Sequence, residues 1–344
     1  MLTIFGLLGA LFAGVAADAL LSGKSTPEQD TDDLPPEDDA SAPDNGYLLD
    51  EPENLDEPEN DDDLYGPRSP ESSDRETPED APVRANGSNG DDLITGGTAD
   101  DVLVGAAGDD QIDALAGDDT LGGGEGDDIL WAGDGDDSMA GGSGDDMLHG
   151  QDGDDFATGD FGDDTLYGHE GDDSLSGDAG ADTLLGGAGA DSLLGGDGDD
   201  WVAGGDGNDF VAGGAGADTL DGNAGNDTLS GVDGEGGGAD YLNGGEGDDR
   251  LDIGGGDHAN GGEGEDTFAL HEWLSEGKVA TIDDYDFLQD QIVVVYDPAA
   301  HPDPQLSLSA DDETEHVTIL LDGAPVAVVS GGSVFLSDIK LAAA

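Results

Sequence analysis

From residue 89 to residue 232, hydrophobic and polar positions recur with a period of nine residues, repeated sixteen times without a gap. Position six of each copy is a large apolar residue in fifteen copies, Ala157 being the exception, and it stands between more variable residues at positions five and seven. Alternation over three residues predicts a short β-strand whose middle side chain faces a core. The pattern therefore predicts one strand and one core residue in every copy.

The rest of each copy predicts a tight turn. The full register is x-Gly-x-Asp-x-U-x-Gly-Gly, where U is the apolar residue, and position two is Gly in fifteen copies, with Ala99 as the exception. Glycine accepts the positive φ angles that such turns require. Strand, turn, strand and turn make a flattened coil of two copies, and a period this short indicates coils stacked on one another.

The stacked copies carry a strong negative charge. Between residues 89 and 232 there are 37 acidic residues and no Lys or Arg. Asp occupies position four in all sixteen copies and position three in eleven. Stacked turns bring these carboxylates within a few ångströms of one another, where like charges repel strongly. The sequence therefore predicts that the array binds cations.

The available donor atoms select the kind of cation. The array offers carboxylates and backbone carbonyls, no Cys, and two imidazoles, His149 and His169. Flexible oxygen coordination favours calcium over zinc or copper. If each turn shares an ion with the turn two copies later, there are about fourteen calcium sites. Their charge of roughly +28 would cancel most of the array's negative charge, so calcium binding is close to a requirement for folding.

Segments such as Gly141–His149, with the sequence Gly-Gly-Ser-Gly-Asp-Asp-Met-Leu-His, resemble the RTX, or hemolysin-type, calcium-binding repeats. The resemblance implies an all-β fold, the calcium-stabilised parallel β-roll, in which the position-four Asp and turn carbonyls hold calcium. It continues less regularly beyond the array, past an apparent insertion at Asp233 to Gly236 and a copy at Gly255 to Gly262 that is one residue short. The metal ligands that the resemblance implies are Asp92, Asp101, Asp110, Asp119, Asp128, Asp137, Asp146, Asp155, Asp164, Asp173, Asp182, Asp191, Asp200, Asp209, Asp218, Asp227, Asp240 and Asp249.

We expect the roll to span residues 89–262 and a small C-terminal β-domain to span residues 263–344. Ile292–Tyr296 and Val317–Leu321 are β-rich runs, and Asp322-Gly323 after the second predicts a two-residue hairpin. The region resembles the β-domain that ends many RTX proteins, whose last segment is an uncleaved signal for the type I secretion machinery. A domain that caps the open end of the roll explains the same pattern, and both interpretations can hold.

Two further regions precede the repeats. Residues 22–88 hold ten of the fourteen prolines and 22 acidic residues, which predicts a disordered, self-repelling acidic linker. A weak calcium buffer or a partner-binding tail is the alternative. Residues 1–21 are apolar except for Asp18. A cleaved signal, a membrane anchor and a buried amphiphilic helix remain open, and we favour membrane association of some kind, although no Lys or Arg precedes the apolar run.

Composition narrows the function and the compartment. A net charge of −78 with seven basic residues excludes nucleic-acid binding through a basic patch and disfavours docking on anionic lipid. The chain has no Cys, so no disulfide can stabilise it outside the cell, but bound metal can. Extracellular calcium modules bind at about 10⁻⁴ to 10⁻³ M. We therefore expect a chain that is unfolded inside the cell and folded in the extracellular space or at the cell surface.

The sequence contains no complete enzyme motif of the kinds considered below. The segment His271–Ser275 begins like a zinc-protease helix, but Ser275 stands where the second His is required. The sequence has neither a Gly-x-Ser-x-Gly elbow nor a P-loop lysine. No segment outside the repeats has the length and composition of a catalytic domain, so we expect a non-catalytic protein.

An apolar and aromatic stripe is predicted on one sheet. Positions five and seven should face solvent, and odd-numbered copies should stack on the same sheet, so such a stripe could bind a cell-surface or polysaccharide ligand. Strand propensity, or cover from the N-terminal tail, is the alternative. The residues are Ile129, Trp131, Met147, Tyr167, Leu185 and Trp201.

These patterns together predict a secreted calcium-binding repeat protein that folds on calcium outside the cell. Its role would be structural or adhesive at the cell surface. The alternative is the remaining secretion and calcium module of an RTX toxin or hydrolase.

Overall fold

The computed structural model describes residues 81–233, 237–271, 278–311, 316–330 and 333–344. The segment 1–21, the linker up to residue 80 and the residues directly after His271 in the protease-like motif lie outside the described residues. Contacts divide the chain after Pro70, so all described residues belong to one compact unit. Among them, no helix is long and apolar enough to span a membrane.

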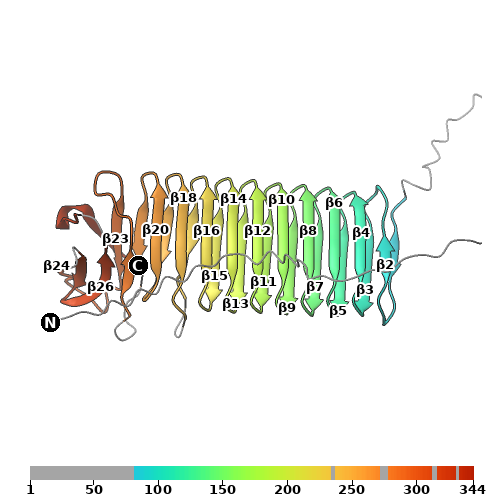
Figure 1. Ribbon diagram of the computed structural model, residues 1–344, viewed down its shortest axis with the longest axis horizontal. Coiled ribbons are helices and arrows are strands. Elements are labelled where there is room, and N and C mark those ends of the chain that lie inside the picture. The colour runs from blue at the N-terminus through green and yellow to red at the C-terminus, as the bar shows by residue number, and fades with distance from the viewer. Residues whose placement is uncertain (1–80, 234–236, 272–277, 312–315, 331–332) are drawn as a thin grey trace, which may run out of the picture. The chain divides into compact units, whose positions relative to one another are not determined.

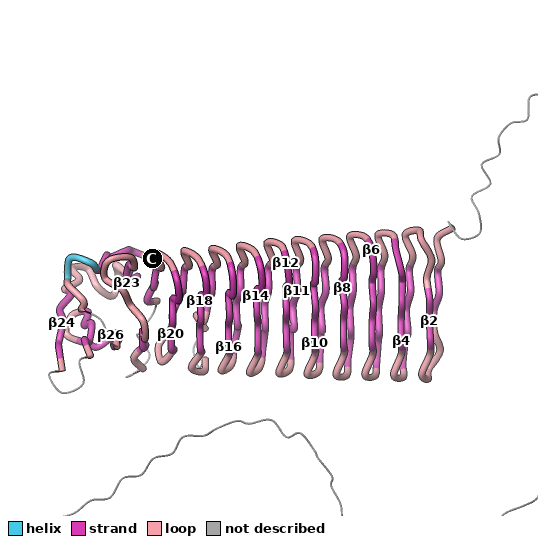
Figure 2. The backbone as a smooth tube through the Cα atoms, turned by 45° about the horizontal axis from the view of Figure 1, so that its top comes forward, coloured by secondary structure: helices cyan, strands magenta, loops and turns pink. Residues whose placement is uncertain are grey.

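The unit is built from two β-sheets, and within the repeats each strand pairs in parallel with the strand two copies later (Figure 1). Strand β10 (Thr165–Glu170), for example, pairs with β12 (Thr183–Ala188), and Leu166 lies opposite Leu184. Turns at both edges carry the chain from one sheet to the other, as the backbone tube shows (Figure 2). The predicted all-β parallel β-roll is confirmed.

One sheet has thirteen strands and the other has fourteen. The thirteen-stranded sheet consists, in order, of β1 (Arg84–Asn86), β3 (Val102–Ala107), β5 (Thr120–Glu125), β7 (Ser138–Ser143), β9 (Phe156–Phe161), β11 (Ser174–Ala179), β13 (Ser192–Asp197), β15 (Phe210–Ala215), β17 (Thr228–Ser230), β19 (Arg250–Ile253), β21 (Thr267–Leu270), β23 (Gln291–Tyr296) and β27 (Ile339–Ala343). The fourteen-stranded sheet consists of β2 (Leu93–Thr95), β4 (Gln111–Ala116), β6 (Ile129–Asp134), β8 (Met147–Asp152), β10, β12, β14 (Trp201–Asp206), β16 (Thr219–Ala224), β18 (Tyr241–Glu246), β20 (His258–Glu263), β22 (Ala280–Ile282), β26 (Ala324–Val329), β25 (Val317–Leu321) and β24 (Leu306–Ala310).

Most strands of the array have six residues, twice the predicted three. The glycine-rich positions eight and nine, predicted as turn, belong to the strand together with position one of the next copy. In the β10–β12 pair, Tyr167 lies opposite Leu185 and His169 lies opposite Gly187. Positive φ does not end the strand, because His169 and Gly187 have φ angles of 83° and 123° and still pair. Only positions two to four remain as the turn.

The core lies between the sheets and is filled by the position-six side chains. Leu166, Leu184 and Val202 have no exposed surface, and the cluster of buried residues runs without a break from Ile94 to Ile339. Burying one aliphatic side chain stabilises the fold by about 1.5–3 kcal/mol. Ala157, the small residue in the pattern, also lies in this core.

Glycine at position two is required by the contact between coils. Gly198 has φ = 148°, and a side chain there would overlap the carbonyl oxygen of Gly180 in the preceding coil. A residue with a Cβ would therefore both strain the backbone and separate the coils.

The C-terminal strands extend the same two sheets. Strand β20 spans the predicted boundary between the roll and the C-terminal domain, which falls between residues 262 and 263. Beyond it, β23 and β27 continue the thirteen-stranded sheet, and β26 and β25 continue the fourteen-stranded sheet. The predicted hairpin at Asp322-Gly323 joins β25 to β26 in antiparallel pairing, and both turn residues have positive φ. The short 3-10 helix η2 (Leu336–Asp338) precedes β27. The C-terminal strands thus cover the open end of the roll.

Candidate metal centre

The position-four aspartates form two buried columns, one along each edge of the roll, because the turns of odd and even copies lie on opposite edges. Those from Asp101 to Asp249 are 0–4% exposed. In each column the Oδ1 atom accepts a hydrogen bond from the backbone N–H of the aspartate one coil earlier. The distance is 2.7 Å from Asp92 N to Asp110 Oδ1 and 2.9 Å from Asp155 N to Asp173 Oδ1. Each carboxylate therefore holds the preceding coil in place.

The second oxygen of the same carboxylates has no partner. Oδ2 is buried and makes no hydrogen bond among the described residues in sixteen of the eighteen predicted ligands. The sixteen are Asp110, Asp119, Asp128, Asp137, Asp146, Asp155, Asp164, Asp173, Asp182, Asp191, Asp200, Asp209, Asp218, Asp227, Asp240 and Asp249. A buried carboxylate oxygen without a partner costs folding free energy, so these oxygens are suited to bind a cation.

The two predicted ligands at the start of the array differ. Asp101 Oδ2 accepts a hydrogen bond from the backbone N–H of Gly97 at 2.6 Å, and Asp92 Oδ2 accepts one from Ser88 N at 2.6 Å. Both oxygens are therefore satisfied by the turn to which they belong.

Several of the unpaired oxygens lie close to a backbone carbonyl oxygen of the neighbouring coil. Beside Gly168, the position where a Cβ would lie overlaps Asp173 Oδ2 and is 2.5 Å from the carbonyl oxygen of Gly186. The same arrangement occurs beside Gly222, with Asp227 and Gly244. Glycine at position eight thus leaves space that carboxylate and carbonyl oxygens line. An oxygen-only donor set of this kind suits calcium.

Burial raises the pKa of the column carboxylates. The pKa is raised to about 7 at Asp155 and Asp200 and to about 8 at Asp240. Neighbouring carboxylates raise it further, whereas the backbone N–H bonded to Oδ1 lowers it. Without a cation these groups hold protons near neutral pH, so calcium and protons compete for the same oxygens.

Position three forms a second hydrogen-bond ladder, in the opposite direction and at the surface. Asp145 Oδ1 accepts from Asp163 N at 3.0 Å, one coil later. Asn226 Oδ1 serves equally well, because it accepts from Asp248 N at 2.9 Å. Since a neutral amide fills the role, the function of position three is to tie coils together.

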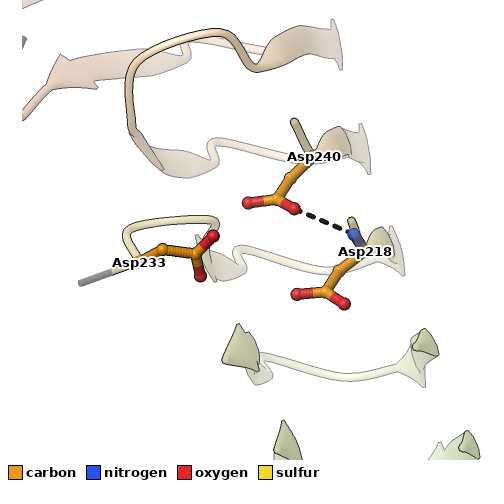
Figure 3. Close-up of side chains that lie close together, drawn as sticks. All are labelled: Asp218, Asp233 and Asp240. Carbon is orange, nitrogen blue, oxygen red and sulfur yellow. Dashed lines mark hydrogen bonds between the residues drawn. The ribbon is translucent and has the colours of Figure 1, made fainter. Parts of the chain in front are cut away.

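An irregular cluster lies where the repeat is interrupted (Figure 3). Asp233, from the insertion, has a carboxylate oxygen within 4.8 Å of oxygens from Asp218 and Asp240. Asp240 Oδ1 accepts a hydrogen bond from Asp218 N at 2.8 Å, as in the regular columns. Burial, with Asp218 and Asp257 nearby, raises the pKa of Asp233 to about 6. Lys278 Nζ donates to the carbonyl oxygen of Gly237 at 2.7 Å, which fastens the end of the insertion.

Four aspartates of these sites lie outside the ligands predicted from the sequence. Asp233 lies outside the nine-residue register, and Asp257 follows a shortened copy, yet its Oδ1 accepts from Asp240 N. Asp266 and Asp290 continue the other column, with hydrogen bonds from Asp249 N and Asp266 N. Asp266 could have been found, because Gly261–Ala269 obeys the register.

Comparison with known families gives one match. The RTX calcium-binding nonapeptide repeat, in a family model of four copies, matches residues 86–121, 115–148, 149–184, 176–211, 203–235 and 236–257. Together these segments span half of the chain, from the first strand to the shortened copy. No curated protein matches the chain.

The raised carboxyl pKa values predict a pH-dependent calcium requirement. In the absence of calcium the roll holds protons up to about pH 7 at groups such as Asp155, whereas the unfolded chain loses them near 3.8. The stability of the metal-free roll therefore falls as pH rises through this window. Between pH 6 and pH 8 the unfolded chain and the calcium-loaded roll have both lost these protons, so lowering the pH from 8 to 6 stabilises only the metal-free roll. The fraction of chain that is folded in chelator should therefore increase at pH 6, and the calcium concentration at the folding midpoint should fall with it. Circular dichroism in chelator and during calcium titrations at the two pH values measures both effects. A midpoint that rises when the pH is lowered would contradict this account.

Proposed function

We propose that this chain, which belongs to the RTX family of calcium-binding nonapeptide repeat proteins, is a secreted protein that folds when it binds calcium outside the cell and that has no catalytic role. Calcium binding by the repeats is the property of the family. The observation that supports the rest most directly is the set of sixteen buried Oδ2 atoms without a partner. Above the pH at which these carboxyl groups lose their protons, the coils cannot close until cations neutralise the buried charge.

The proposed ligands are the column aspartates together with backbone carbonyls of the turns. Bound calcium supplies positive charge and oxygen coordination between adjacent coils. The regular array would hold about fourteen ions if each is shared by two coils. Asp233 would give the irregular cluster a third carboxylate, and Asp257 and Asp266 would extend the columns toward the C-terminal strands.

Calcium concentration sets the proposed location. Modules of this class bind at about 10⁻⁴ to 10⁻³ M, which is met outside cells and not in the cytosol. The unfolded chain would pass through a type I exporter and fold on the far side. Strand β27 belongs to the proposed secretion signal and pairs with β23 in the folded roll, so the signal would be unpaired before folding and held at the edge of the sheet afterwards.

A matched pair of substitutions tests the metal role of the columns. Asp173→Asn keeps an Oδ1 acceptor for Asp155 N but removes the charge at the unpaired Oδ2. We expect it to bind at least one calcium ion fewer and to lose about 1–3 kcal/mol of stability at calcium concentrations ten- to hundredfold above Kd. Asp172→Asn keeps the exposed hydrogen bond from Ala190 N and should behave like the wild type. Equilibrium dialysis and denaturant unfolding in calcium give the two readouts. Equal losses in both variants would show that the columns have no special role.

Export is tested in living cells. The intact protein should stay inside cells that lack type I export and should reach the medium or the cell surface when that machinery is present. Immunoblots of the two fractions, with a cytosolic marker as a leakage control, measure the distribution. Export that is unaffected by the loss of the machinery would remove the secretion proposal.

A structural or adhesive role at the cell surface is the second part of the proposal. On the outer face of the fourteen-stranded sheet, Trp131 lies beside His149, which lies beside Tyr167, and Met147 and Trp201 are 38% and 41% exposed. Aromatic side chains in such rows bind sugars and protein partners. The variant with both Trp131→Ser and Trp201→Ser should bind cells or polysaccharide at least tenfold more weakly. If binding to cells and polysaccharide is unchanged, these side chains contribute only to strand formation and not to ligand binding. Calcium binding by the variant serves as the folding control.

A further inference from the structure

The two histidines of the array meet on the outer face of the fourteen-stranded sheet. His149 lies on β8 and His169 on the adjacent β10, and His149 Nδ1 is 3.2 Å from His169 Nε2. They are twenty residues apart in sequence, and parallel stacking brings position seven of one copy near position nine of the copy one coil later. The two imidazoles therefore approach each other by their nitrogen atoms.

Aromatic neighbours hold one of the rings. His149 is stacked between Trp131 and Tyr167, with ring centroids 6.1 Å and 4.8 Å away and interplanar angles of 4° and 3°. His169 also stacks against Tyr167, at 5.7 Å. Such contacts restrict the side-chain rotamers, so the two nitrogen atoms are held near each other before any ligand arrives.

The surroundings of the pair favour a cation. A surface pocket is lined by Trp131, His149, Gln151, Asp152, His169 and Glu170. It therefore combines two imidazoles with two carboxylates, and the array from residue 89 to residue 232 has no Lys or Arg that could repel a cation. Burial lowers the pKa of His149, with His169 as a second cause.

We propose that His149 and His169 form a binding site for one late transition-metal ion, such as Zn²⁺, separate from the calcium columns. Two nitrogen ligands at about 2.0–2.1 Å from a tetrahedral zinc ion are about 3.3 Å apart, close to the separation seen here. Imidazole nitrogen selects zinc, copper or nickel, whereas calcium takes oxygen ligands. Among the described residues no carboxylate joins the two imidazoles in a group of ligand atoms within 4.8 Å of one another, so water completes the coordination.

The test uses the full-length chain saturated with calcium, so that the roll is folded and the oxygen sites are occupied. Zn²⁺ is titrated by calorimetry into the wild type and into His149→Gln and His169→Gln. We expect one zinc ion per wild-type chain and at least tenfold weaker binding in each variant. His258→Gln is the matched control, because His258 lies on the same sheet and stacks on an aromatic ring, Tyr241, at 5.0 Å. It should bind zinc as the wild type does.

Fluorescence gives a second readout that depends on geometry. Cu²⁺ bound at the pair lies close to Trp131 and should quench its emission, and this component should disappear in Trp131→Phe and in His169→Gln. Circular dichroism in calcium first establishes that each variant folds; if one of the histidine variants does not, the other carries the test.

Two outcomes would overturn the proposal. In the first, zinc binds His149→Gln and His169→Gln as tightly as it binds the wild type, which would show that carboxylates hold the ion. In the second, calcium displaces zinc at the same concentrations in the wild type and in all variants, which would show that zinc occupies the calcium columns. Neither outcome bears on calcium-dependent folding, which is measured separately in the absence of zinc.

Discussion

The structure depends on the stacking of buried carboxylates at a spacing of one coil. From Asp110 to Asp249, each position-four aspartate must lie in the turn for its Oδ1 to accept the backbone N–H of the preceding coil, and its Oδ2 is then buried without a hydrogen-bond donor. The hydrogen bond and the unpaired oxygen are two results of one geometry. The same carboxylates that hydrogen-bond adjacent coils to one another therefore also repel one another, until a cation binds between them.

The other features of the repeat serve this arrangement. Glycine at position eight makes room for Oδ2, and glycine at position two lets one coil contact the next. The position-six side chains supply most of the core, so each coil contributes little apolar burial of its own. Because hydrophobic burial is modest and charge repulsion is large, the folding free energy is coupled tightly to metal binding. On the proposed function, a rise in calcium concentration acts as the signal to fold.

Much of this could be predicted from sequence, because one short period repeats many times. Position six predicted the core, alternate copies predicted the two sheets, and the excess of carboxylates predicted the metal. Strand length was predicted as three residues because glycine usually indicates a turn, whereas here Gly187 pairs within a strand despite its positive φ.

Sites at interruptions of the repeat, or between copies, could not be predicted from the nine-residue pattern. Asp233 lies in an insertion, and its approach to Asp218 and Asp240 depends on how the loop folds back. The pairing of His149 with His169 depends on stacking between coils and on the direction of two side chains, neither of which the linear register contains. Such contacts lie between copies, so they appear only when the coils are placed in three dimensions.

The central claim is that closing the roll and neutralising the Asp columns are the same event. The most direct measurement is a calcium titration of the full-length chain in which bound calcium ions and far-ultraviolet circular dichroism are recorded on the same samples. The account predicts little β-structure without calcium at pH 8 and a cooperative gain of β-structure that saturates together with at least about fourteen bound ions per chain. A roll that is fully formed in excess chelator, or that folds before calcium is bound, would contradict it.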